Sequence, residues 1–347
     1  MKKPLYLITG GSGFFGVHMA DKLLKEGVSV RLSDISDLEE PKLIGKVEFY
    51  KGDVRDKEFM LTACKDVDVV IHAAASLPIQ ASAEKIKSVN LDGTRTTIEA
   101  AHECGVKKYV QISSTAIYGV PRFHPIYETS EIVPLGPYGE SKWAAEGICR
   151  EFREKGMPVC IIRPKTFLGP ERLGVFQILF DWVRRGKKIY VIGDGTNKYQ
   201  LLAVSDLVHA IWLASLSENS NTEFNIGATE YGTMNSDLQN VLNYAKTNAK
   251  LSHLPPRLTK MILRFLEVTK LSPLVQWQYE TMDKDSFVDV SKAMKLLNWT
   301  PQKSNAETLL ENYKWYEEHW QEFEGKSGLT HRVPWNQKIL KLVRFFS

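Results

Sequence analysis

The stretch that decides the fold is Thr9-Gly10-Gly11-Ser12-Gly13-Phe14-Phe15-Gly16. It follows a short apolar run over residues 5–8, which predicts a strand, and it leads into a segment whose apolar residues Phe15, Met19 and Leu23 recur at helical spacing. A glycine turn between a strand and a helix lets the backbone approach a diphosphate closely, and the free N–H groups of the helix N-terminus point at it. The sequence therefore predicts a dinucleotide-binding turn.

An acidic residue after the next expected strand, residues 28–33, indicates which dinucleotide is bound. Asp34 stands at the end of that strand, where a carboxylate can accept hydrogen bonds from both ribose hydroxyls of the adenosine half. The same carboxylate would repel a 2′-phosphate, and residues 35–39 bring no basic side chain. We therefore predict that the cofactor is NAD rather than NADP.

Strand-like and helix-like segments alternate through the first half of the chain. This rhythm predicts an α/β fold, a Rossmann-like doubly wound parallel sheet with helices on both faces. The expected strands are residues 5–9, 28–33, 47–50, 68–73, 107–113 and 158–163, and the expected helices are residues 14–26, 57–65, 88–104 and 138–155.

The alternation loosens after about residue 165. We expect residues 1–165 to form an NAD-binding Rossmann domain to which residues 205–226 return, and residues 166–330 to form a smaller C-terminal α/β substrate lobe. We expect residues 331–347 to form a basic amphipathic C-terminal tail. In the second half the expected strands are residues 189–192 and 223–226, and the expected helices are residues 175–186, 205–217, 234–249, 291–297 and 305–320.

The composition is that of an ordinary globular chain. It has 347 residues, a net charge of +4 and 43% hydrophobic residues. No arginine-rich run or zinc pattern is present, so we expect no nucleic-acid partner. The four cysteines lack metal-ligand spacing, so we expect no metal site and free thiols in a reducing compartment. Residues 1–5 run directly into the first expected strand, so we expect no signal peptide and a cytoplasmic protein.

Two groups of residues carry the candidate chemistry. Tyr138 and Lys142 lie four positions apart on an expected helix, so their side chains share one face. A nearby cation stabilises a phenolate and lowers the pKa of a tyrosine, which makes Tyr138 a candidate general acid/base for an alcohol–ketone interconversion. The hydroxyl run Ser113-Ser114-Thr115 ends an expected strand and can hydrogen-bond the reacting oxygen.

Together these motifs resemble the extended short-chain dehydrogenase/reductases, in the nucleotide-sugar epimerase/dehydratase group. The resemblance spans most of the chain in ordered matches. The matching segments are residues 9–16, 52–56, 70–75, 89–94, 112–119, 138–142, 163–164, 169–170, 204–206 and 298–301.

The resemblance implies a role for each matching residue. It implies catalysis by Tyr138, Lys142 and Ser114, with Ser113 as the alternative hydroxyl. Asn90 matches an asparagine that anchors a helix, and a purely structural role is an equal alternative. The implied NAD-binding residues are Gly10, Gly13, Phe14, Phe15, Gly16, Asp34, Asp53, Val54, Ala73, Ala74, Ala75, Asn90, Ser113, Tyr138, Lys142 and Pro164, and the implied substrate contacts are Ser114, Thr115, Lys165 and Tyr199.

The chain departs from the family pattern at positions where relatives contact the substrate. Many relatives that bind nucleotide diphosphates place an arginine where this chain has Tyr199, and a second arginine before residues 289–293 is also missing. Lys198 or Lys284 could supply point charges instead, although a lysine does not reproduce a bidentate arginine. Dehydratases place an acidic pair directly after the catalytic hydroxyl, whereas Thr115 follows it here, which disfavours dehydration.

Two surface features bear on partners. On a helix, residues 335–347 would place apolar side chains on one side and basic side chains on another, a pattern suited to a membrane interface, and residues 257–267 are similar. Docking on the protein's own core or on a dimer partner is the alternative. The resemblance also implies a homodimer through the helices at residues 88–104 and 138–155.

Three functions remain open from the sequence. The leading one is NAD-dependent oxidation and reduction of a secondary alcohol on a sugar, most simply an epimerisation, with the sugar carried on a nucleotide diphosphate or a polyprenyl diphosphate. The second is net dehydrogenation of a hydrophobic alcohol, resembling the 3β-hydroxysteroid or sterol dehydrogenases. The third is a non-catalytic dinucleotide-binding scaffold, which would not need Ser114, Tyr138 and Lys142.

Overall fold

The computed structural model describes residues 3–77, 81–171, 175–219, 221–268 and 276–323. The tail at residues 331–347 lies outside these described residues. Within them, no helix combines the length and apolar character that crossing a bilayer requires.

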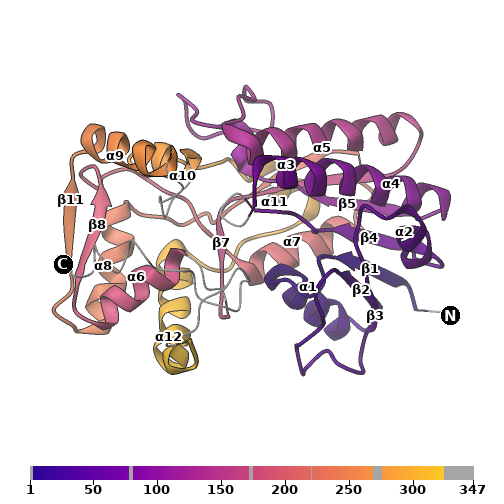
Figure 1. Cartoon of the computed structure of the whole chain (residues 1–347), viewed down its shortest axis with the longest axis horizontal. Coiled ribbons are helices and arrows are strands. Elements are labelled where there is room, and N and C mark those ends of the chain that lie inside the picture. The colour runs from indigo at the N-terminus through magenta and orange to yellow at the C-terminus, as the bar shows by residue number, and fades with distance from the viewer. Residues whose placement is uncertain (1–2, 78–80, 172–174, 220, 269–275, 324–347) are drawn as a thin grey trace.

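A seven-stranded sheet forms the centre of the larger part of the molecule (Figure 1). Every neighbouring pair of its strands is parallel. Apart from the edge strand at Glu48–Lys51, the strands are largely buried, because helices cover both faces of the sheet. The order is β10 (Glu223–Ile226), β6 (Val159–Pro164), β5 (Lys108–Ile112), β4 (Val69–His72), β1 (Leu5–Thr9), β2 (Ser29–Asp34) and β3 (Glu48–Lys51), which confirms the expected doubly wound fold.

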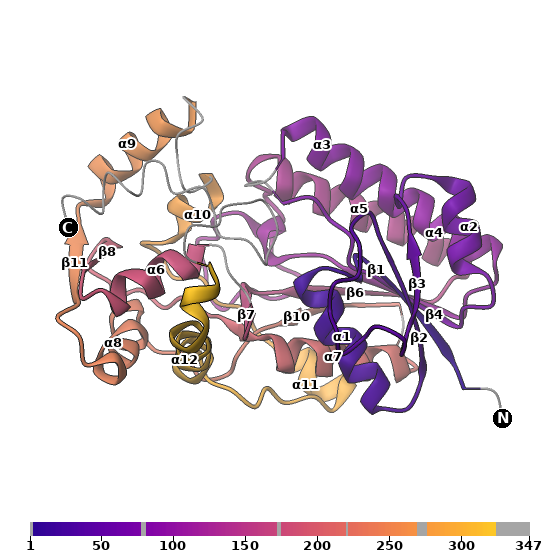
Figure 2. The ribbon, with the colours of Figure 1, turned by 60° about the horizontal axis from the view of Figure 1, so that its bottom comes forward.

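The two helical layers enclose separate apolar cores. One layer packs Met19, Leu23 and Ile211 against the sheet, and the other packs Ile98, Ile148 and Phe152 against the opposite face. Figure 2 shows the layers on either side of the strands. The first consists of α1 (Phe14–Lys25), α7 (Val204–Leu216) and α11 (Ser291–Leu297), and the second of α2 (Lys57–Cys64), α3 (Ala83–Lys87), α4 (Gly93–Glu103) and α5 (Gly136–Glu154).

The chain crosses between the large sheet and a smaller lobe more than once. After β6 it forms the short strand β7 (Phe167–Leu168), which pairs with β9 (Leu202–Ala203), and it then returns through α7 and β10 to the edge of the sheet. A third apolar core, around Phe180, Val241 and Tyr313, belongs to the lobe. The lobe contains α6 (Val175–Arg184), β8 (Lys188–Ile192), α8 (Met234–Ala245), β11 (Lys250–Leu254), α9 (Pro256–Val268), α10 (Gln276–Thr281) and α12 (Asn305–Phe323).

Several expected helices have different bounds in the structure, and three of them show a clear structural difference. The helix expected at residues 88–104 begins earlier, as α3, and continues into α4 through a π-helical turn at Ser88–Asp92. The helix expected at residues 138–155 begins at Gly136, because Pro137 is well suited to the first turn of a helix. The helix expected at residues 234–249 ends at Ala245, where Lys246 takes a left-handed backbone (φ 51°).

A buried ion pair joins α5 to the sheet. Glu146 on α5 and Arg163 on β6 are 0% and 3% exposed, and the guanidinium donates to both carboxylate oxygens at 2.7 and 2.9 Å. The same carboxylate accepts a hydrogen bond from Ser113 Oγ at 2.6 Å, and Arg163 also donates to Tyr118 Oη at 2.8 Å. One carboxylate therefore connects α5 with the ends of β5 and β6.

Glu146→Ala leaves the Arg163 guanidinium buried without its counter-ion, so we expect the free energy of unfolding to fall by about 3–5 kcal/mol. Guanidinium chloride denaturation measures this change. Glu140→Ala, on an exposed position of the same helix, is the matched control and should change stability by less than about 0.5 kcal/mol. Equal effects of the two substitutions would contradict the assigned importance of the pair.

Candidate active site

The glycine turn between β1 and α1 has no room for side chains. Gly10 has φ +70°, and a Cβ there would lie 2.9 Å from the backbone of Ala74. A Cβ on Gly16 would lie 2.4 Å from the carbonyl oxygen of Gly10. Gly13 precedes the first residue of α1 and offers no capping side chain, so the first N–H groups of the helix keep no side-chain partner there. This is the backbone that a diphosphate can approach.

Asp34 ends β2 beside this turn. Its carboxylate accepts hydrogen bonds from the backbone N–H of Ser12 at 3.1 Å and of Ser36 at 2.9 Å, which orient it. Burial raises the pKa of the Asp34 carboxyl. A carboxylate has about four acceptor positions, so positions remain for ribose hydroxyls.

The other predicted cofactor residues lie at the ends of the neighbouring strands. Ala73, Ala74 and Ala75 follow β4, and Ala74 is the residue that approaches Gly10. Val54 is buried, whereas the half-exposed Asp53 forms an ion pair with Arg55 at 2.6 Å. Phe14 and Phe15 are buried at the start of α1, where both contact the ring of Phe167.

Asn90 uses its side-chain amide to hold other parts of the protein. Its Oδ1 accepts from the N–H of Ser76 at 2.7 Å, and its Nδ2 donates to Ser76 O at 3.2 Å and to Ser141 Oγ at 3.0 Å. It therefore connects the loop after β4 with α5. These hydrogen bonds are what we expect of an asparagine that anchors a helix.

Tyr138 and Lys142 lie together on α5. Lys142 is 4% exposed, its Nζ donates to the carbonyl of Ile112 at 2.9 Å, and it lies 6.0 Å from the centre of the Tyr138 ring. Burial lowers the pKa of Lys142 to about 8. Since Ile112 is the last residue of β5, this hydrogen bond places the ammonium group at the carboxyl edge of the sheet.

The three hydroxyl residues after β5 have different partners. Ser113 is buried and donates to Glu146, whereas Ser114 is half-exposed and its Oγ accepts from the N–H of Ala116 at 3.1 Å. An oxygen that accepts one hydrogen bond can still donate its own proton to a substrate. Thr115 donates to the carbonyl of Pro164 at 3.3 Å, which joins this segment to the end of β6.

A second group of polar residues follows β6. Lys165 is 4% exposed, and its Nζ donates to Ser286 Oγ at 2.7 Å and lies 5.1 Å from the centre of the Tyr199 ring. Burial lowers the pKa of Lys165 to about 7. The Tyr199 side chain hydrogen-bonds Thr166 and Thr281.

Sequence reasoning did not identify Thr281 and Ser286 as neighbours of this group. No local signal could have done so, because the segment that contains them pairs with residues 198–200 from far along the chain. The two lysines considered as replacement charges, Lys198 and Lys284, both have exposed side chains.

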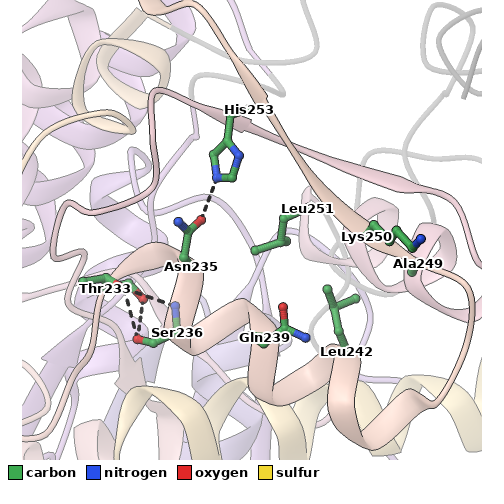
Figure 3. Close-up of a pocket in the computed structure, with 9 residues that line it drawn as sticks. All are labelled: Thr233, Asn235, Ser236, Gln239, Leu242, Ala249, Lys250, Leu251 and His253. Atoms are coloured by element: carbon green, nitrogen blue, oxygen red, sulfur yellow. Dashed lines mark hydrogen bonds between the residues drawn. The ribbon is translucent and has the colours of Figure 1, made fainter.

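A pocket elsewhere in the lobe contains none of the predicted site residues. Figure 3 shows it between α8 and β11, where His253 hydrogen-bonds Asn235 at 3.0 Å. Among the residues that the structure describes, no group of three or more His, Cys, Asp or Glu side chains could hold a metal ion.

The order of motifs and the strand-end geometry agree with a family model that matches residues 6–227, the NAD-dependent epimerase/dehydratase family. The chain belongs to this family. It is therefore an NAD-dependent enzyme of the extended short-chain dehydrogenase/reductase type, as the resemblance implied. The crowded glycine turn and the oriented Asp34 carboxylate fit NAD.

Proteins similar to this chain carry names that indicate different activities. An uncharacterized protein, y4nG, of Sinorhizobium fredii is 36% identical over 98% of this chain and 85% of its own length. A decarboxylating sterol-4-alpha-carboxylate 3-dehydrogenase of Mus musculus is 29% identical over 78% of this chain and 77% of its own. The crystal structure of UDP-glucose 4-epimerase from Thermotoga maritima with UDP-glucose has a TM-score of 0.77 at 25% identity, covering 91% of this chain and 99% of that one.

If Asp34 binds the adenosine ribose, NAD should bind more tightly than NADP, and Asp34→Asn should weaken NAD binding about tenfold, or about 1.4 kcal/mol. Asp37→Asn is the control, since Asp37 is exposed on the same loop and pairs with Lys51 instead. Equilibrium titration of each protein with both cofactors measures the effect. Tighter binding of NADP to the unaltered protein would refute the role of Asp34.

Proposed function

We propose that the enzyme epimerises a secondary alcohol of a sugar carried on a diphosphate, either a nucleotide diphosphate or a polyprenyl diphosphate. The observation that carries the proposal is the buried Lys142 ammonium, which lies 6.0 Å from the centre of the Tyr138 ring. It donates to Ile112 O, two residues before Ser114, at the carboxyl edge of the parallel sheet. A binding scaffold needs no such acid/base pair. The proposal also draws on the UDP-glucose 4-epimerase similarity.

In this proposal Ser114 and Tyr138 act on the reacting oxygen, and Lys142 acts through Tyr138. Ser114 donates a hydrogen bond to the substrate oxygen, and Tyr138 takes the hydroxyl proton as the alcohol becomes a ketone. Lys142 stabilises the tyrosine in its phenolate form. NAD, held by the glycine turn and Asp34, would supply the hydride acceptor and then the hydride donor. Tyr138 returns the proton after the ketone has turned its opposite face to the cofactor site.

Epimerisation fits the site better than dehydration. Loss of water needs an acid and a base next to the reacting carbon, whereas Thr115 and Ala116 follow Ser114. Glu140, within the same turn of α5 as Tyr138, is exposed.

A net dehydrogenase of a hydrophobic alcohol is the second candidate. It is favoured by Tyr199, whose hydroxyl bonds Thr166 and Thr281 at the position where diphosphate-binding relatives place an arginine. The similarity to a sterol dehydrogenase supports the same candidate. The two candidates differ in stoichiometry, because only net oxidation accumulates NADH.

We infer peripheral contact with a membrane through α9, which has its apolar side outward. Its polar side faces α10 and the following turn: Lys260 pairs with Asp283 at 2.6 Å, and Glu267 accepts a hydrogen bond from Tyr279 at 2.6 Å. A surface helix normally buries its apolar face. Here the exposed residues at helical spacing are Leu258, Met261, Ile262 and Phe265, at 50%, 61%, 49% and 69%.

We also infer a homodimer, by resemblance to the family, through α4 and α5. These helices lie side by side in the layer that covers one face of the sheet (Figures 1 and 2).

Tyr138→Phe removes the proton-transfer group and should lower kcat by about 10²–10⁴ while the fold and NAD affinity stay unchanged. The assay incubates the NAD-loaded enzyme with UDP-glucose and UDP-glucuronate and follows epimerised product by NMR. Tyr127→Phe, on an exposed loop position, is the control and should retain full activity. A Tyr138→Phe enzyme as active as the control would refute the assigned role.

Phe265→Ser combined with Met261→Ser should abolish co-flotation of the protein with vesicles, because it removes two of the four apolar contacts of α9. The vesicles contain phosphatidylcholine with phosphatidylglycerol. Leu216→Ser, at a 56% exposed position at the end of α7, is the control and should still float. Vesicles that fail to carry the unaltered protein would overturn the membrane inference.

A further inference from the structure

Lys165 places a cation where the sheet meets the lobe. It directly follows Pro164, the last residue of β6, and its backbone N–H donates to Ile226 O at 2.9 Å, so its position is set by β6 and β10. Thr115 contacts Pro164 from the neighbouring strand end. The side chain of Lys165 therefore starts from the edge that also carries Ser114 and extends toward Ser286 of the lobe.

Among the described residues, this buried amine has no acidic partner. Its hydrogen-bond partner is the Ser286 hydroxyl, and in the part of the chain that the structure describes no carboxylate forms an ion pair with Lys165. Asp285, the neighbour of Ser286, is exposed and accepts from the backbone N–H of Lys198 at 2.8 Å. Buried charges in proteins are normally paired, because an unpaired one loses its hydration without compensation.

Among the described residues, a second buried polar atom whose pKa is affected by Lys165 has no hydrogen-bond partner. Within the described residues, Nε2 of His124 is buried without a hydrogen bond, and its ring lies 4.9 Å from the ring of Phe287. Burial lowers the pKa of His124, the charge of Lys165 lowers it further, and Asp285 opposes this effect. His124 and Lys165 thus both contact the segment at residues 286–287.

We propose that Lys165 and His124 form a subsite that binds an oxyanion of the substrate, either a carboxylate on the reacting sugar or a phosphoryl oxygen of its carrier. The proposal rests on the proposed function, because it assigns a substrate group to the same site. An oxyanion supplies both the missing counter-charge and a hydrogen-bond acceptor.

The subsite also explains how the chain tolerates Tyr199. Lys165 Nζ lies 5.1 Å from the centre of the Tyr199 ring, so the cation comes from the end of β6 instead of from the position that holds arginine in relatives. A lysine ammonium is a point charge that can bind either a carboxylate or a phosphate. It lacks the planar guanidinium of arginine, whose fixed donors favour one geometry. Lys165 is therefore a specificity-determining residue.

The charge state of Lys165 gives the proposal a thermodynamic signature. With a pKa of about 7 in the free protein, Lys165 is partly neutral at pH 7.5, and a bound oxyanion raises that pKa. Binding of an oxyanion should therefore take up a proton. Calorimetric titration in two buffers of different ionisation enthalpy counts the protons.

The experiment titrates the full-length NAD-loaded protein at pH 7.5 with UDP-glucuronate, UDP-glucose, UDP, D-glucuronate and inorganic diphosphate. We expect at least one of these oxyanions to bind with proton uptake. Lys165→Met should weaken that binding at least tenfold and remove the uptake. Lys188→Met, at an exposed position of β8, is the control and should change neither quantity.

The two sources of the oxyanion give different results. If the group is a carboxylate on the sugar, Lys165→Met removes a preference for UDP-glucuronate over UDP-glucose. If it is a phosphoryl group, the variant weakens UDP-glucose, UDP and inorganic diphosphate alike. Binding of every probe with the same affinity to the variant and the unaltered protein, or the absence of binding and proton uptake for all five, would overturn the subsite.

A second variant, His124→Phe, keeps the test decisive if Lys165→Met does not fold. His124→Phe keeps the ring contact with Phe287 and removes the donor, so it should weaken the same oxyanion several-fold. The lowered pKa means that the lysine binds a proton more readily in the unfolded chain than in the folded one between about pH 7 and about pH 10.4. The buried lysine therefore lowers the stability of the fold, and this effect is largest below pH 7. For this reason Lys165→Met should itself fold. These readouts involve no turnover, so failure of the subsite is distinct from failure of the epimerase proposal, which Tyr138→Phe tests.

Discussion

The buried contact between Glu146 and Arg163 is the constraint on which the site depends. It joins the middle of α5 to β6, and through Ser113 it also reaches the end of β5. Tyr138 and Lys142 lie on that helix, Ser114 follows that strand end, and Lys165 follows β6 by one residue. A change in this pair would therefore shift the proposed catalytic hydroxyl, the proposed acid/base pair and the proposed oxyanion subsite together.

The charges around the site are unevenly compensated. Arg163 has a full carboxylate partner, whereas Lys142 is held by a backbone carbonyl and Lys165 by a serine hydroxyl. Burial lowers the pKa of both lysines, to about 8 and about 7. Two under-compensated cations flank the strand edge, and this favours a phenolate next to the first and an anionic substrate group next to the second.

The regular part of the fold was predictable because it depends on local patterns. The glycine turn, the buried apolar strands and the amphipathic helices of the first half are each encoded within a few residues, and their order requires a parallel sheet. The lobe was less predictable. The strand at Lys250–Leu254 was not expected, since its pairing partner, Lys188–Ile192, lies far away in the sequence, and the π-helical turn at Ser88–Asp92 has no local signature.

The sequence by itself determined the family, the NAD turn, and the spacing of Tyr138 and Lys142, because short-range geometry imposes those residue types. It favoured Ser114 over Ser113 as the catalytic hydroxyl, and only the tertiary structure shows that Ser113 pairs with a carboxylate 33 residues away. The same holds for Lys165, His124 and Ser286. Their meeting depends on the return of the chain from the lobe to the sheet, and burial without a counter-ion is a property of that packing, which no run of neighbouring residues encodes.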